Sequence, residues 1–323
     1  MTTLFAVQFS LPLLLIFWMT LAPPRTLFAF CIQAVACATA LWAMAVPGIW
    51  LLPPWWAPWA FGIGFATATW VGLRRCRPFT SALPVTAGGW TVAGLFVALG
   101  IASACGVVIA MRSRTAPLAS AVKLVFPLEP GIYLVVNGGS DINTNAHLMT
   151  LDTSIPRFRE WRGQSYGVDI VKLDAFGLRA RGVLPADPKA YGIYGTRVLA
   201  PCAGQVLLAV DGLPDMQVPE VDRNHLAGNH VMLRCAHPDA HADVLLGNLR
   251  PGSVRVRAGA SVAVGDWLGS AGNSGNTGEP HLHVHAHVHA QRPSPVGAPL
   301  GGDPLPVRFS GYFPVRGDRI ESP

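Results

Sequence analysis

The first 128 residues of this chain contain no aspartate or glutamate, and this feature constrains the fold more than any other. The first acidic residue is Glu129, all ten histidines lie at or after His147, and eight of the ten tryptophans lie at or before Trp90. Of the whole chain, 51% is hydrophobic and 13% is charged, whereas an ordinary soluble domain has about 25% charged residues. The sequence therefore predicts an apolar membrane part followed by a polar part. The polar part, roughly 190 residues, is long enough to enclose its own core.

The apolar part contains runs that approach the ~20 residues a helix needs to cross a bilayer. These runs lie at 4–22, 26–46, 54–73 and 87–111. The first run has no basic segment before it and further runs follow, so we expect an uncleaved span rather than a signal peptide. The tryptophans and prolines between Trp50 and Trp59 are typical of a loop at the membrane interface. We therefore expect a four-helix transmembrane region at 1–111 and a linker at 112–128.

The charges predict both the topology and the class of partner. Residues 1–128 carry seven basic side chains, and the remainder carries 17 basic and 18 acidic ones, so the formal net charge of +6 comes from the membrane part. The sequence has no basic patch interleaved with aromatic residues, so we expect no nucleic-acid partner. If the arginines at 74–77 face the cytoplasm, everything after Arg112 is extracytoplasmic. We therefore expect an integral protein of a bacterial inner or cytoplasmic membrane, with its C-terminal domain at 129–323 in the periplasm. No span has an ionisable residue at mid-depth, so we expect the spans to anchor and not to transport.

The polar part changes to short β-type runs separated by glycine and proline, which predicts a mainly antiparallel β domain. The runs expected to be strands include Ile132–Val136, Val198–Ala200, Gln205–Val210, His230–Leu233, Asp243–Leu246, Val254–Val256 and His281–His289. Cys202 and Cys235 are the only cysteines of this part and lie in or beside neighbouring strand-like runs. We therefore predict a disulfide between them in an oxidising compartment.

Five histidines recur at every second position from His281 to His289, directly after the loop from Gly272 to Pro280. A strand places alternate side chains on one face, so all five imidazoles would point the same way. Each ring brings polar nitrogens that need partners, which argues against an ordinary apolar core. The pattern leaves two interpretations open: a metal-binding face, or a solvated polar face with only one or two histidines used.

The run Gly272-Asn-Ser-Gly-Asn-Thr-Gly-Glu-Pro-His-Leu-His283 resembles the active-site signature of the lysostaphin-type zinc metallopeptidases, a family of peptidoglycan endopeptidases. Weaker similarities follow the family's order at Val198–Val206, Gly228–Leu233 and Leu249–Val254, so the resemblance covers residues 135–290. It implies a lysostaphin-type fold for the β domain, a zinc cofactor, and peptidoglycan peptides as substrate.

The resemblance also implies roles for single residues. The second histidine of the H-x-H, His283, would bind zinc, and the first, His281, would assist the chemistry. The family's H-x-G-x-D would end at Asp169, but Ser165 stands at the place of its histidine. A branch of the family has N-x-H upstream of Q-x-Y-x-x-D, which is similar to Asn145-Ala-His147 and Gln164-Ser-Tyr-Gly-Val-Asp169. We therefore expect His147, Asp169 and His283 to be the zinc ligands.

One further position departs from the family. Where the family has a histidine before Leu249, this chain has Asn248, which can donate a hydrogen bond but cannot carry a proton at neutral pH. We expect Asn248 to steady the oxyanion, with His237 and His241 as the residues able to compensate. The sequence thus predicts a membrane-anchored zinc endopeptidase of peptidoglycan. The alternatives are a weak or inactive relative that binds cell wall or regulates a partner hydrolase, and a histidine-rich metal sensor.

Overall fold

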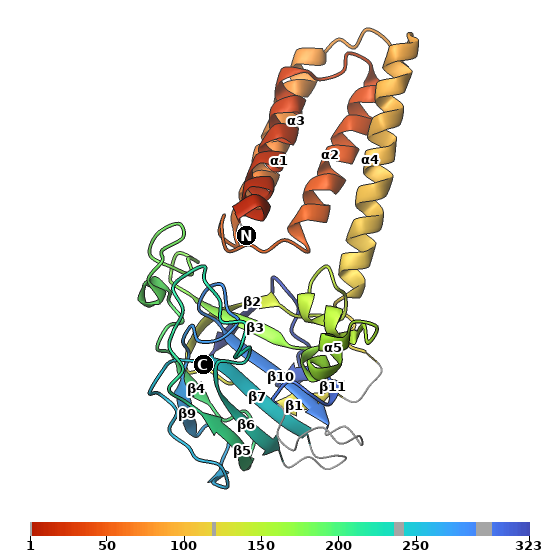
Figure 1. Cartoon of the computed structure of the whole chain (residues 1–323). Helices are drawn as coiled ribbons and strands as arrows, with labels where there is room; N and C mark the ends of the chain where they lie inside the picture. The colour runs from red at the N-terminus through yellow and green to blue at the C-terminus, as the bar shows by residue number, and fades with distance from the viewer. Residues whose placement is uncertain (1, 118–120, 236–241, 289–298) are drawn as a thin grey trace. The chain divides into compact units, whose positions relative to one another are not determined.

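The chain divides into two units, Met1–Arg112 and Ser113–Pro323, in a computed structural model (Figure 1). The structure describes residues 2–117, 121–235, 242–288 and 299–323, with side chains from residue 6 onward. His237, His241 and His289, which the sequence analysis named, lie outside the described residues.

The first unit consists of helices where the sequence predicted apolar runs. They are α1 (Thr2–Leu21), α2 (Leu27–Ala45), α3 (Ala57–Cys76) and α4 (Ala87–Arg112). Among the described residues, α2 and α4 are long and apolar enough to cross a membrane, and the part of α1 from Ala6 to Leu21 is apolar but shorter. Of the four helices described in this unit, α2 and α4 are therefore the candidate membrane spans.

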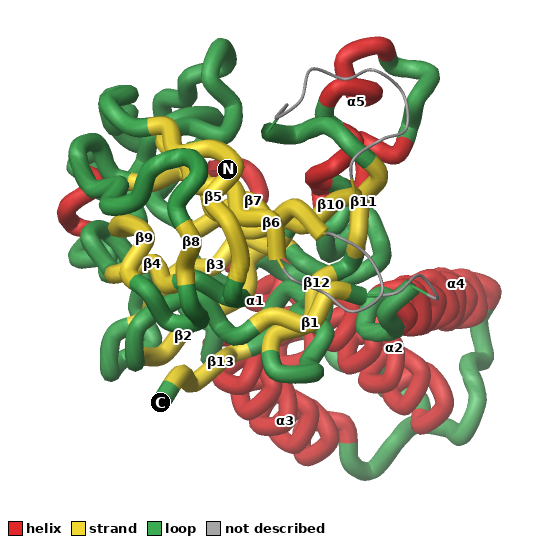
Figure 2. Tube along the Cα trace, turned by 90° about the horizontal axis from the view of Figure 1, so that it is seen from below, coloured by secondary structure: helices red, strands yellow, loops and turns green. Residues whose placement is uncertain are grey.

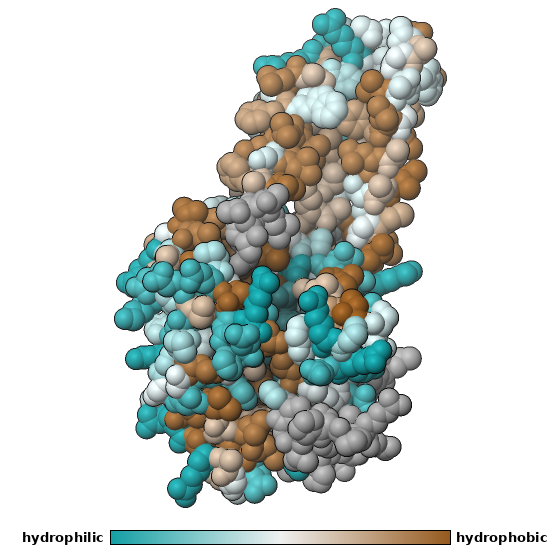
Figure 3. Space-filling view, viewed as in Figure 1, coloured by the Kyte–Doolittle hydropathy of each residue, from teal (hydrophilic) through white to brown (hydrophobic). Residues whose placement is uncertain are grey.

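Small side chains allow these helices to approach closely. A Cβ added at Gly100 of α4 would lie 3.5 Å from the Cα of Ala36 in α2, and one at Gly72 of α3 would lie 2.7 Å from the carbonyl oxygen of Met19 in α1. Close backbone contact between small residues is the usual way in which helices associate where lipid surrounds them. Large apolar side chains remain exposed around the unit, and they appear brown in the space-filling view (Figure 3).

The second unit is built on a nine-stranded antiparallel sheet in the order β13-β2-β3-β10-β7-β6-β5-β8, with β11 paired to β10 (Figure 2). Its strands are β2 (Gly131–Asn137), β3 (Val168–Leu173), β5 (Gly204–Val210), β6 (Asn229–Cys235), β7 (Ala242–Leu249), β8 (Ser261–Val262), β10 (Leu282–Val288), β11 (Asp303–Leu305) and β13 (Arg319–Ser322). Two further pairs lie outside it, the antiparallel β4 (Arg197–Leu199) with β9 (Trp267–Ser270) and the parallel β1 (Val122–Leu124) with β12 (Val307–Phe309). The short helices are η1 (Ala146–Leu151), α5 (Pro156–Glu160), η2 (Arg162–Gln164) and η3 (Pro188–Ala190). The predicted mainly antiparallel β domain is confirmed.

Strand β10 shows how the alternating sequence is used. Leu282, Val284 and Ala286 are fully buried in the main hydrophobic core of the unit. The histidines between them project from the opposite face of the strand, as the period of two requires. Histidines 283, 285 and 287 are also buried, with exposed fractions of 6%, 0% and 2%. The solvated-face interpretation is therefore wrong for these three residues.

The structure corrects two expectations about the β domain. The segment expected as a linker, 112–128, contains β1, which pairs with β12 and buries Val122 and Leu124 in the core, so the second unit already begins at Ser113. Val254–Val256 is not a strand, although both valines pack against the core from an irregular segment. A short apolar run predicts burial more reliably than it predicts extended pairing.

The predicted disulfide is confirmed. Cys202 and Cys235 are bonded, with their Cα atoms 5.7 Å apart. The antiparallel register of β5 and β6 sets Gly204 opposite Cys235, and Cys202 lies two residues before Gly204. The bond therefore joins the start of β5 to the end of β6.

Candidate metal centre

Asp169 and His283 face each other across neighbouring strands. They are directly opposite in the antiparallel pair of β3 and β10, and opposite residues project from the same face of a sheet. Nδ1 of His283 lies 2.8 Å from Oδ1 of Asp169, and both residues are buried. Strand pairing therefore brings together two residues that are more than a hundred positions apart in the sequence.

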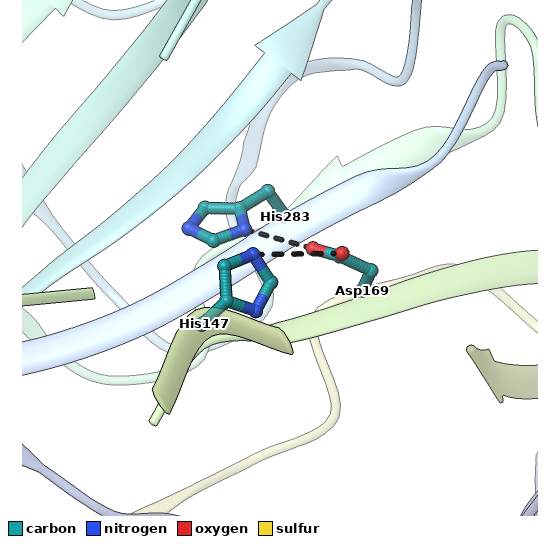
Figure 4. A group of neighbouring side chains, drawn as sticks. All are labelled: His147, Asp169 and His283. Atoms are coloured by element: carbon teal, nitrogen blue, oxygen red, sulfur yellow. Dashed lines mark hydrogen bonds and ion pairs between the residues drawn. The ribbon is translucent and has the colours of Figure 1, made fainter. Parts of the chain in front are cut away.

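His147 reaches the same carboxylate from η1. Its Nε2 lies 3.6 Å from Oδ2 of Asp169. Figure 4 shows the three side chains converging from three different elements. One ligand atom from each of His147, Asp169 and His283 lies within 4.8 Å of the others. The geometry thus gathers the three residues expected to bind zinc.

Asn145 fixes the orientation and tautomer of His147. Its Nδ2 donates to the carbonyls of Gly139 and Gly167 at 3.2 and 3.1 Å, so its Oδ1 is the atom that faces His147. That oxygen accepts the backbone N–H of His147 at 3.1 Å and lies 3.0 Å from Nδ1 of the ring. An amide oxygen only accepts, so Nδ1 carries the proton and Nε2 presents a bare lone pair to Asp169. The sequence motif contained Asn145, but its role was not predicted.

Gly167 is required by the closeness of the two histidines. A Cβ at this position would lie 2.8 Å from Cε1 of His283 and 3.3 Å from Nδ1 of His147. Any side chain there would push one imidazole away from Asp169.

A chain of hydrogen bonds fixes the tautomer of His283. Nε2 of His285 lies 3.1 Å from the carbonyl oxygen of Pro299, which can only accept, so this nitrogen carries a proton. Burial and the surrounding imidazoles hold the pKa of His285 well below its ordinary value, so the ring is neutral and its Nδ1 is bare. That Nδ1 accepts from Nε2 of His283 at 3.0 Å. Because Nε2 of His283 is the donor in this chain of hydrogen bonds, Nδ1 is the nitrogen left to bind a metal, and it points at Asp169.

The charges at the cluster suit a cation. Burial lowers the pKa of His147 to about 4, so the ring is neutral at pH 7. Burial alone would raise the pKa of Asp169, but the surrounding imidazoles, His147 first among them, hold it below its ordinary range. A bare nitrogen 2.8 Å from an ionised carboxylate needs a proton or a metal ion between them.

The donor set fits zinc. Two imidazole nitrogens and one carboxylate are the protein ligands of a catalytic zinc site, which keeps a fourth position open. Ligand atoms ~2.1 Å from a tetrahedral ion are about 3.4 Å apart. The observed nitrogen-to-oxygen distances, 2.8 Å for His283 and 3.6 Å for His147, lie on either side of that value.

Two further residues support Asp169 and were missed by the sequence analysis. Nδ2 of Asn137 donates to Oδ2 of Asp169 at 2.8 Å, and Oδ1 of Asn137 accepts from Nη2 of Arg316 at 2.8 Å. Burial lowers the pKa of Arg316 to about 10, and the guanidinium still remains charged at neutral pH. No local pattern marks these two residues, because the tertiary fold alone brings 137 and 316 together.

His281 lies at the edge of the cluster, on the loop that precedes β10. Its Nδ1 is 2.9 Å from the carbonyl oxygen of Glu279, so this nitrogen carries the proton. Its bare Nε2 lies 3.6 Å from Oδ1 of Asp169. The carboxylate of Glu279 is held by a buried ion pair with Arg179, with Nη2 and Oε2 3.0 Å apart. Glu279, whose backbone carbonyl orients His281, is therefore itself held in place through its side chain.

Asn248, the residue predicted to steady the oxyanion, makes a contact that the sequence did not predict. Its Nδ2 donates to the carbonyl oxygen of Ser274 at 2.8 Å, so one N–H of this amide holds the glycine loop. Its backbone adopts φ 60°, a conformation that asparagine tolerates better than most residues. The contact adds a loop-holding role to Asn248, and its role at the oxyanion stays a prediction.

Ser165, at the place of the family's histidine, is a buried structural residue. Its Oγ lies 2.8 Å from Oγ1 of Thr150 and 2.6 Å from the carbonyl oxygen of Arg162. Thr150 in turn donates to the carbonyl of His147 at 2.7 Å. Ser165 thus ties the segment before β3 to the helix that carries His147.

Comparison with known proteins identifies one segment. Residues 190–295, about a third of the chain, match the family model described as "Peptidase family M23". They include Asn248, His281 and His283, whereas His147 and Asp169 precede them. No curated protein matches the sequence.

Three solved structures illustrate the similarity. The catalytic domain of lysostaphin from Staphylococcus simulans is 21% identical, with 43% of this chain and 74% of that chain covered and a TM-score of 0.26. A putative peptidase M23 from Pseudomonas aeruginosa is 17% identical, with coverage of 53% and 48% and a TM-score of 0.27. A zinc-containing peptidase from Vibrio cholerae is 17% identical, with coverage of 37% and 46% and a TM-score of 0.22. The segment at residues 190–295 is therefore similar to the peptidase M23 family, and it lies within the mainly antiparallel β unit.

Proposed function

We propose that the protein is a membrane-anchored zinc metallopeptidase that hydrolyses peptide bonds of peptidoglycan on the extracytoplasmic side of a bacterial membrane. The observation that carries this proposal is the cluster of His147, Asp169 and His283, in which two bare imidazole nitrogens face one carboxylate. The M23 match supports the peptidase class. The apolar helices α2 and α4 support anchoring, and the Cys202–Cys235 bond supports an oxidising compartment.

In this proposal the two histidines and Asp169 hold zinc, and zinc, when bound, polarises the scissile carbonyl and lowers the pKa of a bound water to about 7. His281 acts as the general base. Its bare Nε2 accepts the proton of the attacking water, while its Nδ1–H stays bonded to the Glu279 carbonyl. The protonated ring then delivers that proton to the departing amine.

A catalytically weak or inactive relative is the second candidate, and Asn248 is the observation that favours it. A family histidine is replaced by a residue that cannot carry a proton, and its Nδ2 donates to Ser274. Such a module would bind cell wall, or regulate a partner hydrolase, with the fold and metal retained.

The experiment that separates the two candidates measures release of new amino termini from purified peptidoglycan by the full-length, zinc-loaded chain in detergent. The parent protein is expected to cleave, and His281→Ala to lower the rate by about 10²–10⁴-fold because the general base is lost. Asn248→His is expected to raise the rate, since it adds a group able to transfer a proton. No cleavage by the parent or by Asn248→His, with zinc bound and circular dichroism unchanged, would leave the second candidate.

Metal stoichiometry on the same preparation separates the enzyme from a histidine-rich sensor. One tightly bound zinc per chain supports the three-ligand centre, because its donor set is complete. Several weakly bound ions would instead support the sensor.

A further inference from the structure

A pocket of about 470 Å³ lies at one end of the helical unit, where α1 and α3 end. Its lining comes from the ends of these two helices and from the loops that follow them. Backbone hydrogen bonds join the two loops: the N–H of Thr80 donates to the carbonyl oxygen of Arg25 at 3.0 Å, and that of Leu27 donates to the carbonyl oxygen of Ser81 at 3.1 Å. The pocket is thus built within one unit, from segments that the fold holds together.

Three arginines line this pocket, and they are Arg25, Arg75 and Arg77. All three residues are exposed, so a ligand can reach them. Nη1 of Arg75 donates to the carbonyl oxygen of Thr20 at 2.9 Å, which satisfies a group that the last turn of α1 leaves open. Among the described residues, the guanidinium groups of Arg25 and Arg77 have no hydrogen-bond or ion-pair partner. Because residues 1–128 contain no acid, the unit itself offers no carboxylate to neutralise them.

Membrane topology alone does not require this arrangement. The topology signal depends on how many basic residues a loop carries, and not on whether their side chains line one pocket. Arg74 shows the contrast, because its guanidinium stacks on Trp70, 4.5 Å from the ring centroid, and it is not among the described residues that line the pocket. The three pocket arginines therefore call for a ligand of opposite charge. A guanidinium presents a planar fork of N–H donors, which matches the oxygens of a phosphate group.

The apolar surroundings of the pocket indicate where that phosphate comes from. Leu21 also lines the pocket and is 73% exposed. Hydrophilic side chains gather at this end of the helical unit, above the apolar flank of the helices (Figure 3). A lipid would place its phosphate among the arginines and its acyl chains against Leu21 and the flank, whereas a free phosphate would use the arginines alone.

The length of α4 indicates which leaflet the pocket would meet. This helix has 26 residues and is about 39 Å long, more than the ~30 Å of the hydrocarbon core. It leads from the loop after α3 to Arg112, and the β unit begins at Ser113. If the β unit is extracytoplasmic, as in the proposed function, the pocket lies at the cytoplasmic leaflet. Anionic lipids give that leaflet a negative surface potential.

We propose that this pocket binds the phosphate group of an anionic lipid, an inference that rests on the membrane anchoring in the proposed function. The guanidinium groups of Arg25 and Arg77 bind the phosphate oxygens, and Arg75, fixed by α1, adds its remaining N–H groups. The bound lipid supplies the negative charge that this unit lacks, and it links the loop after α1 to the loop after α3.

The test is native mass spectrometry of the full-length chain in a neutral detergent. The probes are phosphatidylglycerol and phosphatidylcholine with identical acyl chains, and the fraction of chains that carry one lipid is followed through a titration. Phosphatidylglycerol is expected to bind about tenfold more tightly, because the phosphate of phosphatidylcholine already has a cation within its own headgroup. Equal affinity for the two lipids would overturn the proposal.

A matched pair of double variants then assigns the preference to the pocket. Arg25→Gln with Arg77→Gln removes two charges from the lining and is expected to weaken phosphatidylglycerol binding about tenfold, with phosphatidylcholine unchanged. Arg74→Gln with Arg112→Gln removes two charges outside the lining and is expected to leave both affinities unchanged. An equal loss in the two double variants would show that net charge alone attracts the lipid, and it would overturn the proposal.

Inorganic phosphate distinguishes the two sources of the ligand. At a concentration equal to that of the lipid it is expected to leave phosphatidylglycerol bound, because it has no acyl chains to contact Leu21. Displacement of the lipid under these conditions would make free phosphate the ligand and overturn the lipid assignment.

These measurements fail separately from the proposed function. Hydrolysis of cell wall by a chain that resists carbonate extraction, together with equal lipid affinities, would overturn the pocket alone. A phosphatidylglycerol preference in a chain that cleaves nothing would keep the pocket and overturn the peptidase. Extraction of the chain by carbonate would overturn the anchoring, whatever its lipid affinities in detergent.

Discussion

The helical unit and the β unit use apolar residues in opposite ways. In the helical unit Ile63 and Leu95 are 71% and 67% exposed, whereas Leu246 and Val284 of the β unit are fully buried. A monomeric soluble protein rarely leaves large continuous apolar patches uncovered. The same residue types are thus exposed in one unit and buried in the other, so the surroundings of each unit determine where its apolar side chains lie. The exposed apolar surface of the helices supports a lipid environment for them.

The two units also differ in whether their buried polar side chains have hydrogen-bond partners. Gln8 and Gln33 are buried in the helical unit, and their amide atoms have no hydrogen-bond partner among the described residues. In the β unit the buried amides of Asn145 and Asn229 are bonded to backbone groups at 2.8–3.2 Å. The buried polar groups of the β unit are thus organised, and the unpaired Nε2 of His230 is conspicuous beside them. The following experiments test whether each substitution affects only the unit in which it lies.

The largest effect is expected from the ligands of the metal centre. Asp169→Ala or His283→Ala should remove the bound zinc and the hydrolysis, because solvent does not replace a lost ligand at comparable affinity. The measurement is zinc per chain by atomic absorption after gel filtration. Asp152→Ala, at an exposed carboxylate of the same unit, is the matched control and should retain the metal. Full zinc occupancy in His283→Ala would contradict the assignment.

The next largest effect is expected from removing the disulfide. This change should lower the stability of the β unit alone. Replacing Cys202 and Cys235 together with serine removes a cross-link over 33 positions, which contributes about 3–4 kcal/mol in the chain-entropy model. For a unit of this size the thermal midpoint should fall by roughly 10 °C. Cys31→Ser with Cys105→Ser, both exposed in the helices, is the control and should leave that midpoint unchanged. An unchanged midpoint in the Cys202/Cys235 variant would show that the cross-link does not stabilise the unit.

A charge introduced on the apolar surface should affect only the helical unit. Ile101, in the middle of α4, is 62% exposed. If that surface meets lipid, Ile101→Arg should cost about 2.5–3.5 kcal/mol on insertion and lower the fraction that resists carbonate extraction from membranes. Leu178→Arg, at a 39% exposed leucine of the β unit, is the matched control. Equal extraction of both variants and the parent would count against the transmembrane assignment.

The smallest effect should come from the hydrogen bond that fixes the tautomer of His283. His285→Phe removes the acceptor of its Nε2–H and should weaken zinc binding by about 10–100-fold. His285→Gln keeps an acceptor and should recover part of the affinity, a result that loss of packing alone would not produce. The measurement is competition with a chromogenic chelator, and His225→Phe is the control at an exposed histidine. Unchanged affinity in His285→Phe would contradict the proposed chain of hydrogen bonds.

The sequence predicted the features that local periodicity encodes. The apolar runs became helices, and the alternating run at 281–289 became β10 over its described part because a period of two is specific to strands. Strand β3 was missed, although it carries Asp169 and lies beside β10 in the sheet. Its apolar run is short, and such runs do not distinguish strand from helix.

The sequence predicted only those residues of the candidate site that belong to a recognisable motif. The resemblance supplied Asp169 and His283, and it pointed to His147. Asn137 and Arg316 could not be found in this way, because their contacts depend on the folded arrangement of distant segments. Asn248 was assigned to the oxyanion from its place in the motif, while its contact with Ser274 depends on loop geometry that a motif does not encode.

The support of Asp169 by Asn137 and Arg316 has a consequence for the order of synthesis. A growing chain emerges from its N-terminal end, so all three candidate ligands have been made before Arg316 is added. Until the segment around 316 docks, Oδ1 of Asn137 lacks the guanidinium that anchors it, and Asn137 is freer to turn away from Asp169. Full assembly of the centre is thus delayed until the segment around Arg316 has been translated and has docked.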